Sequence, residues 1–160
     1  MINLNLGCDR FKLPNFVNID FNGEVSPDVC IDLKDIKNYF QDNSVDFIIA
    51  NHVLEHLEDP QKLIQDCYEI LKPFRSLLTV IPDYTKCFDL PVDLAERVII
   101  AGGAHKSLFN QKKLNLMLSY AGFRCFTEII DLNRVPYLLV ANVNDPRPDP
   151  WQTAMIALKT

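Results

Sequence analysis

The stretch Asp46-Phe47-Ile48-Ile49-Ala50-Asn51-His52-Val53-Leu54-Glu55-His56-Leu57 decides how the rest of this sequence is interpreted. It begins with a short apolar run, which is typical of a strand buried on both faces of a sheet. Polar and charged side chains follow directly where that strand should end. We therefore expect a buried strand at residues 45–50, a helical turn at residues 51–57, and chemistry at the junction between them.

Short apolar runs alternate with longer helical patterns on both sides of this stretch. Such alternation is typical of a parallel sheet covered by helices, and so the sequence predicts an α/β fold. Other strands are expected at residues 2–6, 16–19, 28–31, 77–81, 123–132 and 153–159, and helices at residues 34–40, 60–71 and 110–120. Residues 135–143 fit either a strand or a helix, and residues 145–150 read as a rigid surface loop.

Length, charge and cysteine usage limit the classes of protein to consider. A chain of 160 residues has room for one core, so we expect a single domain over residues 1–160. The net charge is −5 and the basic residues are scattered, which argues against nucleic acid as a partner. Five separated cysteines without a CxxC pair suggest reduced thiols. No leader or long apolar span is visible, so we expect a cytoplasmic protein without membrane contact.

Polar residues follow the predicted parallel strands, at the edge where ligands bind in open α/β sheets. A carboxylate after the second strand, Asp20, is placed to accept hydrogen bonds from two ribose hydroxyls. Asp32, after the third strand, can approach the exocyclic amine of an adenine. Gly7 lets the backbone come close to a ligand because it has no side chain. The strand-end residues together favour a nucleoside site, and they are Gly7, Cys8, Asp20, Asp32, Asn51 and His52.

The ordered set of motifs resembles the class I S-adenosylmethionine-dependent methyltransferases. Its parts are Leu4-Asn5-Leu6-Gly7-Cys8, Val17-Asn18-Ile19-Asp20, Asp28-Val29-Cys30-Ile31-Asp32-Leu33, the stretch quoted first, Leu71-Lys72-Pro73, His105-Lys106-Ser107-Leu108-Phe109 and Ala121-Gly122-Phe123. The resemblance implies a three-layer, Rossmann-like sheet of seven strands, mostly parallel with an antiparallel last strand. It also implies that S-adenosylmethionine is the cofactor and lies across the strand ends.

The resemblance assigns a role to each strand-end residue. The amino-acid part of the cofactor would face Gly7 and Cys8, and the ribose would face Asp20. Asp32 and Leu33 would contact the adenine, whereas Asn51 and His52 would lie near the methionine portion and its methyl group. His105 would approach from the substrate side. The candidate catalytic residues are His52 and His105, while Tyr84 and Asp83 could line the acceptor pocket.

The sequence departs from the family pattern around its first loop. Asn5 stands where the family usually has an acid, and Asp9 and Phe11 stand where it has glycines. Only residues 7–15 separate the first two strands, although a parallel crossover usually needs about a dozen residues or more. The first helix must therefore be reduced to a turn. A Phe74-Arg75 pair also replaces the usual glycines after Lys72-Pro73.

A metal-based alternative comes from His52-Val53-Leu54-Glu55-His56, which has the HxxEH spacing of zinc metallopeptidases. Two histidines one helical turn apart would bind zinc, with His105 or Glu128 as the third ligand. The same string is ordinary in the methyltransferase resemblance. His56 should face the same side as Val53, so we interpret it as a packed, hydrogen-bonded residue rather than a catalyst. We therefore expect no metal.

The sequence thus predicts an enzyme, an S-adenosylmethionine-dependent methyltransferase acting on a small-molecule acceptor. Methyl transfer from a sulfonium needs mainly positioning, because the leaving group already carries positive charge. The alternative is a non-catalytic, methyltransferase-like binding module, which the missing glycines and the Phe74-Arg75 pair would suit.

Overall fold

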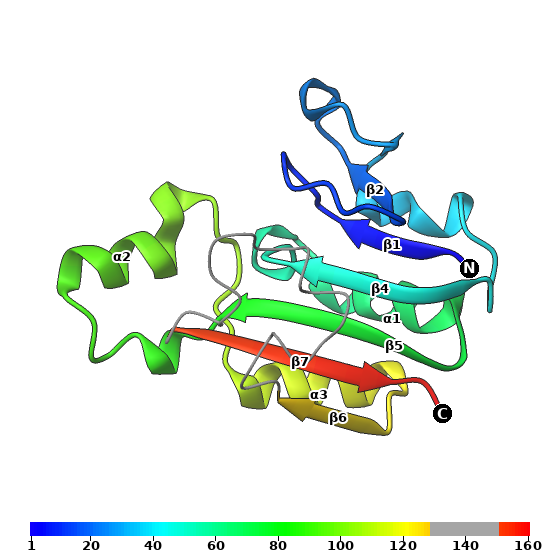
Figure 1. Ribbon diagram of the computed structural model, residues 1–160. Helices are drawn as coiled ribbons and strands as arrows, with labels where there is room; N and C mark the ends of the chain where they lie inside the picture. Colours follow the sequence, from blue (N-terminus) through cyan, green and yellow to red (C-terminus); the bar gives the residue numbers. More distant parts are fainter. Residues whose placement is uncertain (129–150) are drawn as a thin grey trace.

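The computed structural model describes residues 1–128 and 151–160, whose seven strands form one sheet in the order β3-β2-β1-β4-β5-β7-β6 (Figure 1). All neighbouring pairs are parallel except those of β7, which lies antiparallel between β5 and β6. The predicted mostly parallel sheet with an antiparallel last strand is confirmed. The strands are β1 Asn3–Leu6, β2 Val17–Asp20, β3 Val29–Cys30, β4 Val45–Asn51, β5 Leu71–Pro82, β6 Cys125–Glu128 and β7 Gln152–Leu158.

The helices begin and end where local signals in the sequence place them. Asp59 caps the first helix by accepting a hydrogen bond from the Lys62 amide at 3.0 Å, and proline occupies the first helical position. The last described helix ends at Gly122, whose φ of 106° suits glycine. The helices are α1 Pro60–Ile70, α2 Val92–Ile100 and α3 Gln111–Ala121, with 3₁₀ turns η1 Gly23–Val25, η2 Leu33–Asn38, η3 Leu54–His56, η4 Tyr84–Lys86 and η5 Ala101–Gly103.

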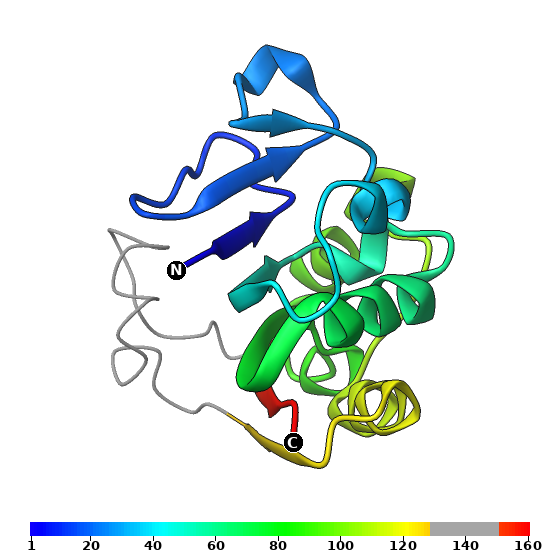
Figure 2. The same cartoon turned by 90° about the vertical axis from the view of Figure 1, so that its right-hand side faces the viewer.

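Among the described helices, α1, α3 and the turn η2 cover one face of the sheet, as Figure 2 shows. The larger apolar cluster lies between them and the strands. On the opposite face, Leu13 from the segment of residues 8–16 packs with Phe47, Ile49, Leu78 and other strand residues. That segment contains no helix, as its short length predicts. A loop rather than a helix therefore packs on this face of the sheet in the described part of the chain.

None of the helices in the described ranges is long and apolar enough to cross a membrane. The predictions for residues 135–143 and 145–150 lie outside the described residues.

A buried polar network closes the short crossover from β1 to β2. Asn5 and Asn18 face each other on these strands, and the Asn5 amide donates to Asn18 Oδ1 at 2.9 Å and to the Phe11 carbonyl at 2.9 Å. Asn18 Oδ1 also accepts from the Leu13 amide at 2.7 Å, and Asn18 Nδ2 donates to Asp28 Oδ2 at 2.7 Å. We call Asn5, Asn18 and Asp28 the asparagine network.

The network links the loop before β2 to Asp28, which directly precedes β3. The Asn18 backbone amide donates to the same Asp28 carboxylate at 2.8 Å, and these two bonds from Asn18 hold the pKa of Asp28 below its ordinary value. Asn5 and Asn18 are both buried, so their polar atoms cannot form hydrogen bonds with water and depend on these partners. The network therefore fixes the path of the loop without a helix.

Asn18→Ala should reduce the free energy of unfolding by about 1–3 kcal/mol, because it leaves the buried Leu13 amide without its acceptor and removes one of the two acceptors of the Asn5 side chain. Urea denaturation of the variant and the parent measures the difference. Asn38→Ala, at the exposed end of η2, is the matched control and should leave the stability nearly unchanged. Equal losses for the two variants would contradict the role given to the network.

Candidate active site

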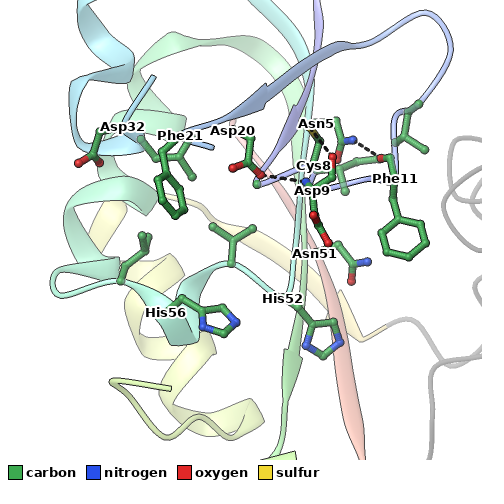
Figure 3. Close-up of a pocket in the computed structure, with 16 residues that line it drawn as sticks. Asn5, Cys8, Asp9, Phe11, Asp20, Phe21, Asp32, Asn51, His52 and His56 are labelled. Carbon is green, nitrogen blue, oxygen red and sulfur yellow. Dashed lines mark hydrogen bonds between the residues drawn. The ribbon is translucent and has the colours of Figure 1, made fainter. Parts of the chain in front are cut away.

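A cavity of about 420 Å³ opens at the carboxyl ends of β1, β2 and β4, where the strand order reverses (Figure 3). This is the edge at which open α/β sheets bind ligands. The structure brings all the strand-end residues singled out in the sequence to this one cavity. Those residues are Gly7, Cys8, Asp20, Asp32, Leu33, Asn51 and His52.

Gly7 lies where β1 meets the turn η3. Its φ is 59°, and a Cβ atom built on it would lie 2.7 Å from Val53 Cγ2. Both the backbone conformation and the close approach therefore require glycine at this position. The absence of a side chain lets the end of β1 form one wall of the cavity.

The backbone amides of the loop after β1 are already engaged within the chain. The Cys8 amide donates to the Ile19 carbonyl at 3.0 Å, and the Phe11 amide donates to the Cys8 carbonyl at 2.8 Å. The Asp9 amide donates to Asp20 Oδ2 at 2.9 Å. The Cys8 and Asp9 amides therefore hold the loop against β2, and the Phe11 amide closes a turn within the loop, so these three amides are not free for a ligand.

Two carboxylates lie at neighbouring strand ends with fixed orientations. Asp20 is buried, and its second oxygen accepts from the Asn22 amide at 2.9 Å. A carboxylate has more lone pairs than these two bonds use, so it can accept further hydrogen bonds from a ligand. Asp32 caps η2 and lies 2.8 Å from Lys34 Nζ, and hydrogen bonding to that side chain holds the pKa of Asp32 below its ordinary value.

Two exposed aromatic side chains at the cavity were not singled out in the sequence. Phe11 is 70% exposed and Phe21 is 78% exposed, and both line the cavity. In Figure 3 the ring of Phe21 lies beside Asp32, between the two carboxylates. The position of Phe21 directly after Asp20 was the available signal. Such exposed apolar surface beside a cavity is typical of ligand-binding sites.

Carboxylates are the main charged groups that line the cavity, and Lys34 pairs with one of them, Asp32, from outside it. Asp9, Asp20 and Asp32 contribute carboxylates, and no lysine or arginine is among the described residues that line it. Burial, followed by the charge of Asp20, raises the pKa of the Cys8 thiol, which therefore stays neutral. The resulting negative potential favours a positively charged ligand and disfavours a phosphate-bearing one.

His52 is held between two partners at the end of β4. Its Nδ1 lies 2.9 Å from Glu55 Oε1 and its Nε2 lies 2.8 Å from Gln152 Nε2. Since the carboxylate can only accept and the amide nitrogen donates, Nδ1 carries the hydrogen and Nε2 accepts from Gln152. His52 therefore presents its acceptor nitrogen in a fixed tautomer.

The structure separates the two candidate catalytic histidines. His105 is not among the residues that line the cavity, and its ring packs against that of His56 at 4.7 Å between centroids. His56 was expected to be packed and hydrogen-bonded. It does form a hydrogen bond with the Ala104 carbonyl, but it is exposed and lines the cavity. Sequence reasoning missed its place at the cavity.

The geometry does not support the HxxEH hypothesis. His52 has a φ of 54° and lies outside the turn η3, which begins at Leu54, so it does not share a helical face with His56. Glu128, one of the suggested third ligands, instead pairs with Lys86 at 2.8 Å.

Comparisons with known proteins find relatives of this fold. Residues 13–78 match the family model of the methyltransferase domain. A S-adenosylmethionine-dependent methyltransferase from Archaeoglobus fulgidus has a similar fold, with a TM-score of 0.73, 19% identity, and coverage of 99% of this chain and 86% of that one. One from Thermotoga maritima gives a TM-score of 0.73, 16% identity and coverage of 99% and 81%. A comparison with curated proteins gives no match.

The fold is that of S-adenosylmethionine-dependent methyltransferases, and residues 13–78 match the methyltransferase domain. A further relative in fold, phosphoethanolamine N-methyltransferase 2 from Haemonchus contortus, was solved in complex with S-adenosyl-L-methionine. It gives a TM-score of 0.66 and 13% identity, with coverage of 99% of this chain and 48% of that one.

Asp83 and Tyr84 lie beyond the cavity and do not line it. Asp83 is 1% exposed and accepts hydrogen bonds from Thr85 Oγ1 at 2.5 Å, Thr153 Oγ1 at 2.8 Å and the Gln111 amide at 3.0 Å. Burial alone would raise the pKa of Asp83, but these hydrogen bonds outweigh it and the pKa lies below its ordinary value. Asp83 therefore joins η4, α3 and β7 as an ionised structural residue.

Asp83→Asn should lower the free energy of unfolding by about 2 kcal/mol at pH 7, because hydrogen bonds to a charged acceptor are lost or weakened. A carboxyl whose pKa is lowered by folding stabilises the protein above its unfolded pKa, near 3.9, and this stabilisation is lost as the pH falls through the folded pKa. The difference between parent and variant, measured by urea denaturation, should thus shrink toward pH 3. The exposed Asp89→Asn is the control, and an Asp83→Asn effect independent of pH would refute this account.

Proposed function

We propose that this protein transfers a methyl group from S-adenosylmethionine to a small-molecule acceptor, and that the cofactor lies in the cavity at the strand ends. The main support is the convergence of the strand-end residues on a cavity that is lined by carboxylates and, among the described residues, by no lysine or arginine. A volume of about 420 Å³ lies within the usual size of small-ligand pockets.

The adenosine half fits the side of the cavity formed by β2 and η2. Asp20 would accept hydrogen bonds from the ribose hydroxyls with the lone pairs that Asp9 and Asn22 leave unused. Asp32 and Leu33 would contact the adenine, with the carboxylate near its exocyclic amine. The exposed ring of Phe21 lies between the two carboxylates and would pack against the base.

The methionine half would extend along Gly7 and Cys8 toward Asn51 and His52. S-adenosylmethionine carries a positive sulfonium and a positive amino group beside a single carboxylate. The acidic cavity suits this charge, whereas a dinucleotide would bring two phosphates against three carboxylates. We therefore expect the cavity to favour S-adenosylmethionine over a dinucleotide.

Positioning is the main contribution of these residues to the reaction. The cofactor, when bound, supplies a methyl group that is already activated by the sulfonium charge. His52 is the candidate to accept a proton from an acceptor that must lose one, because Glu55 holds its Nδ1 hydrogen and leaves Nε2 as the basic atom. The amide of Gln152 now donates to that nitrogen and would have to give way. A small and uncharged or cationic acceptor matches the charge of the cavity.

Isothermal titration calorimetry tests this proposal with S-adenosylmethionine, S-adenosylhomocysteine and NAD as ligands. S-adenosylmethionine should bind and NAD should not. Asp20→Asn should weaken binding about 10- to 100-fold, because a hydrogen bond to a charged group contributes about 1.5–3 kcal/mol. Glu24→Gln, an exposed acid outside the cavity, is the matched control and should bind as the parent does.

Two results would count against the proposal. Failure of the parent to bind S-adenosylmethionine at millimolar concentration would remove the cofactor assignment. Binding without methyl transfer from labelled S-adenosylmethionine to any member of a small-metabolite panel would instead favour a non-catalytic binding module.

A further inference from the structure

Three metal-ligating side chains meet beside the cavity. Glu55, His56 and His105 each offer one ligand atom, and these atoms lie within 4.8 Å of one another. The first two belong to η3 and the third follows η5, so residues almost fifty positions apart are brought together by the fold. We call these three residues the η3 cluster.

Backbone hydrogen bonds hold the two parts of the η3 cluster together. The Glu55 carbonyl accepts from the Lys106 amide at 2.8 Å and the Ser107 amide at 3.2 Å. These bonds place His105 against η3, and its ring lies at 71° to that of His56. The arrangement is thus built by the main chain rather than by a chance approach of surface side chains.

Both imidazoles have the orientation that metal ligands require. His56 Nδ1 lies 3.1 Å from the Ala104 carbonyl, and His105 Nδ1 lies 3.0 Å from the Ile99 carbonyl. A carbonyl only accepts, so each Nδ1 donates its hydrogen and each neutral ring keeps its lone pair on Nε2. Histidines that bind metals usually donate their other nitrogen to such a partner.

The carboxylate of Glu55 supplies an independent observation. Glu55 is 0% exposed, and its Oε1 accepts from His52. Its Oε2 is buried and has no hydrogen-bond partner among the described residues. An unpaired carboxylate oxygen away from water is costly, because burial removes its hydration without replacing it. A cation beside the two histidines would satisfy it.

We propose that Glu55, His56 and His105 bind a divalent transition-metal ion of the zinc type. Two imidazole nitrogens and one carboxylate oxygen form a donor set that suits Zn²⁺ and its neighbours. Three protein ligands leave a fourth position for water or for an oxygen or nitrogen of an acceptor. Since His56 also lines the cavity, the ion would lie at its edge.

This site differs from the one that the HxxEH spacing suggests, and it runs against the sequence-based expectation of no metal. His52 takes no part in it, because its Nδ1 faces Glu55 Oε1 and its Nε2 faces Gln152. The proposal does not rest on the cofactor assignment, since none of the three ligands is among the residues assigned to S-adenosylmethionine.

Zinc titration of the metal-free protein, followed by calorimetry, tests the site. Cys30 is an exposed thiol that could bind zinc by itself, so parent and variants should all carry Cys30→Ser. The parent should bind one equivalent of Zn²⁺. Co²⁺ bound in its place should give the visible absorption bands of a four-coordinate ion. His56→Gln and His105→Gln should each weaken Zn²⁺ binding by at least about 100-fold. Loss of a residue that only orients a metal ligand weakens binding by about 10- to 100-fold, so a larger effect indicates a direct ligand.

Glu58→Gln is the matched control, because this exposed acid lies next to the η3 cluster and pairs with Lys106 outside it. It should bind Zn²⁺ as the parent does. Zn²⁺ should also raise the thermal midpoint of the parent but not that of the two histidine variants, which separates loss of binding from loss of folding. Absence of a stoichiometric site, or histidine variants that bind like the parent, would overturn the proposal. S-adenosylmethionine binding, measured separately, would be unaffected by either result.

Discussion

The hydrogen bonds between Asn5, Asn18 and the loop they enclose are the constraint on which the rest of the site depends. A parallel crossover normally uses a helix to cover the sheet and to carry the chain back. Here the loop is too short for that, and buried amides hold it instead. The network holds the loop at Phe11 and Leu13, while the amides of Cys8 and Asp9 tie the start of the loop to the Ile19 carbonyl and to Asp20.

The short crossover changes how the cavity can hold a ligand. Loop amides that could face an anionic group are used by the Ile19 carbonyl and by Asp20. The recognition groups that remain are the carboxylates at the strand ends and the aromatic rings of Phe11 and Phe21. This combination favours a cationic nucleoside ligand, which is consistent with the proposed S-adenosylmethionine even though the usual glycines are missing.

Local signals in the sequence predicted the elements well, because each depends on neighbouring residues alone. Asp59-Pro60 begins α1, Asn110 caps α3 by accepting from the Lys113 amide, and Gly122 ends it. The strand-end rule located the cavity, since alternating strands and helices leave few arrangements of a parallel sheet.

What the sequence could not show depends on contacts between distant residues. Asn5 was recognised only as a departure from the family pattern, because its partner Asn18 is thirteen residues away. The metal alternative drawn from the HxxEH spacing named His56 and His105 but joined them with His52, whereas the fold brings Glu55 to these two histidines. Asp83 was expected at an acceptor pocket, but its hydrogen bonds to Thr153 and Gln111 make it structural.

A crystal structure of the protein with S-adenosylhomocysteine would test the central claim most directly, namely that the cavity at the strand ends is the cofactor site. The ribose hydroxyls should lie within hydrogen-bond distance of Asp20, and the adenine should pack against Phe21 near Asp32. A ligand bound outside this cavity, or an adenosine in the reverse direction with its base toward His52, would contradict the account.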